Sequence, residues 1–262
     1  MLIRKVLPYA LTQFLIVAFQ WASMIYLPLY FKELGFSNAR IGALISIFSL
    51  STLFLVFPLG VLSDRLPPRP MIVIGSVLAV AFNILMPRFP GFGPSCLLIL
   101  IGGAGFTLSS ISLYSLFFKQ VGAENRGIEV SAFNIGGIMG AGAAALLVGA
   151  LIQAFSSTAI IFPLGAIFSL AWTALALFLP ATRGLSFPIL EYGRDLRKAR
   201  TWVLIAIMFV TASHSGFEQA GYTLLQTEVI GLSVRQVGDL FMIISVWMAI
   251  ITVVTGRLHD RQ

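Results

Sequence analysis

The sequence predicts an all-α membrane protein that crosses the bilayer several times, and three observations support this fold class. Hydrophobic residues make up 58% of the 262 residues and charged residues 10%, with a mean hydropathy of +0.96, whereas soluble domains are roughly 45–50% apolar and 25% charged. The apolar residues form long uncharged runs, and about 20 such residues suffice for a helix to cross the hydrocarbon core. Finally, residues in the second part of the chain repeat residues of the first part at a constant offset of 196 positions.

Eight apolar runs predict eight membrane spans, in chain order 9–31, 41–61, 71–87, 94–118, 130–153, 158–179, 202–227 and 236–255. The first run follows a basic segment, but it is too long for a signal peptide and no small-residue cleavage site follows it, so we expect an uncleaved helix. The third follows two prolines, the fourth is rich in hydroxyl residues, the fifth in Gly and Ala, and the seventh contains ionisable residues.

The longest polar stretch, PATRGLSFPILEYGRDLRKART at 180–201, separates six spans from two. Its prolines, glycines and basic residues are typical of a linker. We therefore expect a six-helix transmembrane bundle at 1–180, a cytoplasmic linker at 181–201, and the first two helices of an incomplete second bundle at 202–262.

The net charge of +7 is explained by membrane orientation. If the N-terminus is cytoplasmic, only four of the 17 Lys and Arg residues fall on the outer side: Lys32, Arg40, Arg88 and Arg235. This asymmetry is the positive-inside bias, which makes a nucleic-acid partner unnecessary. We expect a bacterial-type inner membrane protein with the N-terminus and residue 262 in the cytoplasm.

The chain carries no signature of an enzyme or of a cofactor site. A lone cysteine, Cys96, excludes an intrachain disulfide and a multi-cysteine metal site. The sequence contains no glycine-rich phosphate loop, no HExxH motif and no credible Ser-His-Asp set. We expect no cofactor and no metal, and ATP is not expected as the energy source.

The chain also contains an internal repeat. At an offset of 196 residues, identical residues coincide over some forty positions without a gap: Tyr26 with Tyr222, Gly35 with Gly231, Ser37 with Ser233, Gly42 with Gly238, Ser49 with Ser245, Gly60 with Gly256, Asp64 with Asp260 and Arg65 with Arg261. Glycine, tyrosine and an Asp-Arg pair are hard to match by chance, and parallel repeats of six helices are a known transporter architecture.

The segments GVLSDRLPPRP at 60–70 and GRLHDRQ at 256–262 resemble the cytoplasmic loop between helices 2 and 3 of the major facilitator superfamily, and its weaker copy between helices 8 and 9. The resemblance extends to helix count, orientation and central linker. It departs at Pro67 and Pro68, where the family usually has Gly and Arg. It implies twelve helices, so we expect a truncated chain that lacks roughly 130 residues of a second six-helix repeat.

In that family the aspartate of this loop helps to hold the two bundles together on the cytoplasmic side. The resemblance implies a cytoplasmic gate motif with these members: Gly60, Asp64, Arg65, Arg69, Gly256, Asp260 and Arg261. The alternative for Asp64 is a solvated charge in a turn.

The seventh span holds the most specific ionisable pair. His214 and Glu218 are four residues apart, so they share a helical face inside an apolar run. A buried carboxylate is costly unless it is protonated or paired, and an imidazole could serve either need. We expect proton coupling through this pair. The alternative is that Glu218 reaches the outer interface while His214 hydrogen-bonds a neighbouring helix.

The resemblance also implies that helices 1, 4, 7 and 10 line the substrate path. Our substrate-cavity candidates are Gln13, Gln20, Tyr26, Ser109, Tyr114 and Tyr222. Hydroxyls in membrane helices often satisfy local backbone carbonyls instead.

In the fifth span, Gly136, Gly140 and Ala144 are spaced at intervals of four. They predict a close helix-packing seam, which we expect to lie between the two bundles. Gly127, Gly136 and Gly140 also resemble the antiporter motif of the same superfamily, although the Pro and the paired Gly that follow in that motif are replaced by alanines here.

Together these features predict a secondary active transporter of a small organic solute that works by alternating access. Protons are the expected coupling ion, and efflux is slightly favoured. The scarcity of charge in the spans favours a neutral, amphipathic or singly charged substrate. The alternative is a non-transporting remnant, or a membrane subunit that contributes helices to another protein. The lipid bilayer is the expected environment, and the sequence does not define an oligomeric state.

Overall fold

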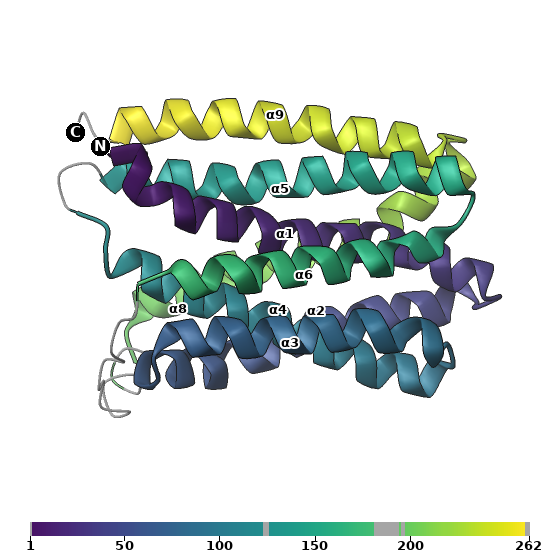
Figure 1. The fold of residues 1–262 in the computed structure, drawn as a ribbon, viewed down its shortest axis with the longest axis horizontal. Helices are drawn as coiled ribbons and strands as arrows, with labels where there is room; N and C mark the ends of the chain where they lie inside the picture. Colours follow the sequence, from purple (N-terminus) through teal and green to yellow (C-terminus); the bar gives the residue numbers. More distant parts are fainter. Residues whose placement is uncertain (1, 123–125, 181–193, 195–196, 260–262) are drawn as a thin grey trace.

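The computed structural model describes residues 2–122, 126–180, 194 and 197–259, and only the backbone of residues 2–4, 64, 208, 211–220 and 259. Eight long helices make up most of the described part (Figure 1), and it contains no strand. Their bounds are α1 Leu2–Glu33, α2 Asn38–Arg65, α3 Pro68–Leu85, α4 Phe92–Phe118, α5 Arg126–Phe155, α6 Ile161–Phe178, α8 Ala199–Leu224 and α9 Val234–His259.

Each predicted span coincides with one of these helices. Seven of them, α1 to α6 and α9, are long and apolar enough to cross a membrane. The eighth, α8, contains residues 211–220, whose side chains lie outside the described part. Below, the "outer end" of the bundle is the end at which α1 stops and α9 starts, and the "inner end" is the end at which α2 stops and α5 starts. These names follow the orientation expected from the charge bias.

The helix ends follow from local sequence. Gly35, with φ +80°, makes the turn between α1 and α2, a backbone conformation that suits glycine because it lacks a Cβ. Ser37 then caps α2 by accepting a hydrogen bond from the backbone N–H of Arg40. Pro67 and Pro68 open α3, because proline fits the first helical turn, where the backbone N–H needs no partner within the helix.

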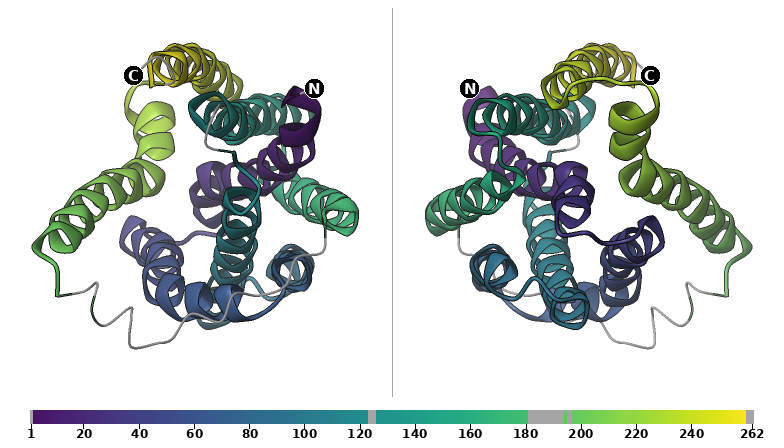
Figure 2. Two further views of the ribbon diagram at one scale, coloured as in Figure 1. Left: turned by 90° about the vertical axis from the view of Figure 1, so that its left-hand side faces the viewer. Right: turned by 90° about the vertical axis from the view of Figure 1, so that its right-hand side faces the viewer.

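The helices form two connected groups. α5 lies between α1 and α9 and makes its most extensive contacts with these two helices, while α4 packs against α2 and α3. α6 joins the groups by contacting both α1 and α3. Seen along the helices (Figure 2), α8 stands to one side of this bundle, and it contacts α1, α2 and the short π-helix η3, Leu225–Val229, which follows it.

Glycines of α5 allow a close contact with α1. A Cβ at Gly136 or Gly140 would collide with the backbone carbonyl of Ala10 or Phe14 in α1. The expected seam between the bundles therefore does not run through these residues, because they face a helix of the same half. Hydrophobic burial does not drive helices together in lipid, so close approach of backbones has to supply the attraction.

The contact between α5 and α9 uses other small residues. A Cβ at Gly238 would lie 2.5 Å from the carbonyl oxygen of Ala145, and a Cβ at Gly142 would lie 2.6 Å from the side chain of Ser245. At the inner end, a Cβ at Gly256 would collide with the Ser131 hydroxyl. A row of small residues thus lets α9, which belongs to the second half, pack along α5 of the first.

Candidate functional site

The motif at the inner end lies where α2 ends and α3 begins. Arg65 is the last residue of α2 and is exposed, and Arg69 lies half-buried in the first turn of α3. A Cβ at Gly60 would meet no described atom of a neighbouring element within 4 Å, whereas its repeat equivalent Gly256 is buried against α5. The side chain of Asp64, and residues Asp260 and Arg261, lie outside the described part, so the expected gate contacts remain predictions.

The backbones of His214 and Glu218 lie one turn apart in α8, but both side chains lie outside the described part. A second intramembrane carboxylate escaped the sequence reasoning. Asp239 is half-buried in α9, interacts electrostatically with Tyr26, and makes no hydrogen bond or ion pair with the described residues. The sequence did contain a signal, because Asp239 is the one charged residue of the span 236–255.

Two of the cavity candidates come together between α1, α4 and α5. The Gln13 side chain is 5% exposed and its Nε2 donates a hydrogen bond of 3.3 Å to the Tyr114 hydroxyl. Its Oε1 is buried without a described partner, which costs about 1–3 kcal/mol. Gly137 leaves room for the amide, since a Cβ there would lie 3.3 Å from it. This Gln13–Tyr114 pair is a largely buried polar site inside the first bundle.

The other cavity candidates lie apart from this pair. Tyr26 is fully buried and its hydroxyl donates to the carbonyl of Ala145 in α5 at 2.7 Å, so its described bond is to a neighbouring helix. Ser109 faces α3 and donates to the carbonyl of Ile72 at 3.3 Å.

The remaining two candidates are half-buried. Tyr222 in α8 packs edge-on against Phe241 of α9, with 5.7 Å between ring centroids. Gln20 in α1 makes no hydrogen bond with the described residues.

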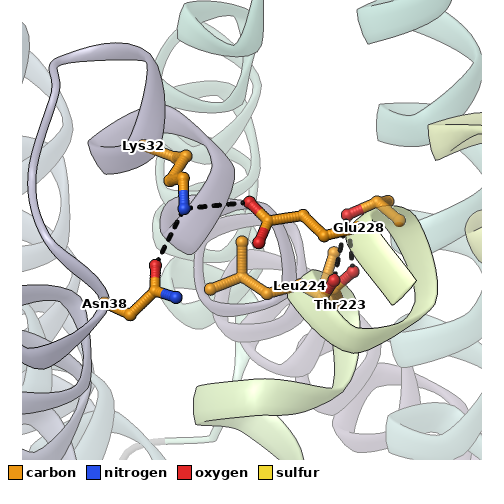
Figure 3. Close-up of polar contacts among 6 residues, drawn as sticks. Lys32, Asn38, Thr223, Leu224 and Glu228 are labelled. Atoms are coloured by element: carbon orange, nitrogen blue, oxygen red, sulfur yellow. Dashed lines mark hydrogen bonds and ion pairs between the residues drawn. The ribbon is translucent and has the colours of Figure 1, made fainter.

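At the outer end, an ion pair joins the two halves of the chain (Figure 3). The Nζ of Lys32, in the last turn of α1, lies 3.1 Å from Oε1 of Glu228 in the π-helix η3. The same ammonium donates to the side chain of Asn38, at the start of α2, at 2.9 Å. Sequence reasoning did not single out this pair, although the two residues are separated by the repeat offset (228 − 32 = 196).

Comparisons with known proteins agree with this architecture. A family model described as the Major Facilitator Superfamily matches residues 9–262. The glycerol-3-phosphate transporter of Bacillus subtilis (strain 168) is 28% identical over 181 residues, which are 64% of this chain and 40% of that protein. The inner membrane protein YqcE of Escherichia coli (strain K12) is 34% identical over 59 residues, 22% of this chain and 14% of that protein. The chain thus spans less than half the length of these curated relatives.

Proposed function

The chain belongs to the major facilitator superfamily, and from this premise we propose that it serves secondary active transport of a small organic solute by alternating access. The family consists of membrane transporters and not of enzymes. In such proteins one bundle rocks against the other around a site near the bilayer midplane. Energy would come from an ion gradient, with the proton as the expected coupling ion and export slightly favoured.

The observation that supports this proposal is the matching local structure at equivalent positions of the sequence repeat. Gly35 and Gly231 have φ +80° and +79°. Ser37 and Ser233 each accept a hydrogen bond from the backbone N–H three residues later, at 3.4 and 3.2 Å. Corresponding positions of the sequence repeat therefore have the same local structure, as a duplicated helix pair requires.

The substrate class follows from the charges of the spans. The eight predicted spans contain no Lys or Arg, whereas a phosphate dianion is bound by Arg or Lys in most protein sites. We therefore propose a neutral, amphipathic or singly charged substrate, unlike the glycerol 3-phosphate in the name of the Bacillus relative. The Gln13–Tyr114 pair, whose amide oxygen has no partner among the described residues, is suited to accept a hydrogen bond from a polar group of such a solute.

The candidates for proton coupling are the three Asp, Glu and His residues of the spans: His214, Glu218 and Asp239. Ionisable groups in the bilayer are expensive and are therefore functional by default. The export preference rests on the similarity of Gly127, Gly136 and Gly140 to the antiporter pattern.

The test uses the full-length protein in proteoliposomes with an imposed pH gradient and a panel of neutral, cationic, anionic and phosphorylated solutes. We expect gradient-driven movement of at least one neutral or singly charged solute, and its loss in Glu218→Gln. Glu33→Gln, which alters an exposed carboxylate at the outer end of α1, is the matched control. If no solute moves, the chain is the non-transporting alternative, and equal coupling in Glu218→Gln would refute that residue's role.

A further inference from the structure

The ion pair at the outer end has a special place in the repeat. Lys32 and Glu228 differ by 196 positions, the same offset that relates Tyr26 to Tyr222 and Gly35 to Gly231. In an arrangement with two-fold symmetry, two equivalent positions can touch each other only close to the symmetry axis. The axis that relates parallel repeats runs along the membrane normal. The 3.1 Å contact between Lys32 and Glu228 therefore marks where this axis leaves the outer end.

On such an axis identical residues would place like charges together. This chain has the Lys32 ammonium on one side of the axis and the Glu228 carboxylate on the other. The two equivalent positions therefore attract each other, whereas identical charged residues would repel. Asn38, at the start of α2, supplies a second acceptor for Lys32, so the ammonium is held between α2 and η3.

We propose that Lys32 and Glu228 form a latch that keeps the outer end closed and must open in each cycle before the outer side becomes accessible. This inference rests on the proposed alternating-access function. A latch on the axis joins α1 directly to the helix that follows α8, so rocking of one half away from the other has to separate this pair.

The strength of the pair suits a contact that breaks repeatedly. The side chains are 43% and 39% exposed, and exposed ion pairs of this kind shift an equilibrium by only roughly 1.4- to 5-fold. Glu228 lies in a π-helical turn, and single π-helical turns often occur at functional sites in proteins. The latch therefore biases the closed state without locking it.

The experiment measures opening of the outer end without using a substrate. In a Cys96→Ala background, Thr223→Cys introduces a reporter thiol beside the pair, at a position that is 3% exposed (Figure 3). Its labelling rate with a membrane-impermeant maleimide is measured in intact cells and in inverted vesicles, so that the reactive side is identified directly.

We expect Lys32→Glu and Glu228→Lys each to increase the labelling rate roughly 2- to 5-fold, and the double exchange Lys32→Glu/Glu228→Lys to restore the parent rate. Arg88→Glu is the matched control, because it also reverses a charge at the outer end. The described hydrogen bond of Arg88 goes to the carbonyl of Ile84, one turn earlier in the chain, and not to the other half. Raising the salt concentration from about 0.01 M to 1 M shortens the Debye length from about 30 to 3 Å, and should speed labelling of the parent but not of Lys32→Gln.

The latch is overturned if the single reversals label at the parent rate, or if the double exchange labels as fast as either single variant. Because the readout is accessibility, its failure is separate from failure of the transport proposal. A labelling rate that depends on these charges in a protein that moves no solute would support the latch and reject transport. Transport by a protein whose labelling rate does not depend on these charges would support transport and reject the latch.

Discussion

The substitution Gly238→Ala tests the close contact between α5 and α9, and its repeat equivalent provides a matched control. A methyl group at Gly238 would lie 2.5 Å from the carbonyl oxygen of Ala145, so the helices must separate by about 0.9 Å to reach an ordinary contact of 3.4 Å. A methyl group at Gly42 would meet no described atom of a neighbouring element within 4 Å. Both variants gain the same intrinsic helix propensity, about 0.8–1.0 kcal/mol in water. The difference between them therefore isolates the steric cost.

Overpacking of this kind costs about 1–3 kcal/mol, and each 1 kcal/mol corresponds to roughly 2–4 °C in Tm for a chain of this size. We expect Gly238→Ala to unfold at least about 2 °C below Gly42→Ala when both purified proteins are followed by tryptophan fluorescence in the same detergent. Replacement by Val and then Leu should widen the gap at Gly238 and have little effect at Gly42. Equal Tm values for the two series would refute the glycine-mediated contact.

Three further predictions concern the polar groups of the first bundle and its neighbours. Tyr26→Phe removes the buried hydrogen bond to Ala145 and should cost about 0.5–1.5 kcal/mol, seen as a lower Tm; unchanged stability would show that this bond contributes nothing. Gln13→Leu and Tyr114→Phe should each raise the KM for the transported solute, and the double variant should add little, because they form one hydrogen-bonded unit; full additivity would contradict a shared site. Asp239→Asn should change the pH dependence of transport if this carboxylate takes part in coupling, and identical pH profiles would exclude it.

The position of every span was predictable from the sequence, because a helix in lipid must satisfy its backbone internally and present about 20 apolar residues. The errors lie at the ends. Residues 41–61 were predicted for the second span, whereas α2 covers Asn38–Arg65, since the Ser37 cap and the polar residues up to Arg65 extend the helix beyond its apolar run. The turn at Gly35 and its copy at Gly231 were visible in advance as repeat positions.

The partners of each helix face were not predictable in the same way. In a soluble helix the apolar face identifies the core side. The helix α5, however, has apolar and small residues on all sides, so hydropathy does not distinguish the side facing α1 from the side facing α9. Gly136 and Gly140 were therefore assigned to the wrong neighbour. The bond between Gln13 and Tyr114 joins residues 101 positions apart, and spacing within one helix gives no sign of such a contact.

The contact between Lys32 and Glu228 also constrains the history of the chain. In a symmetric pair of identical halves, the residue at this position in one half would have contacted the same residue in the other half. Lys would then have met Lys, or Glu would have met Glu. Complementary charges became possible only once the two copies could differ in sequence. In an ancestral pair of identical subunits, the outer closure could not have used this interaction.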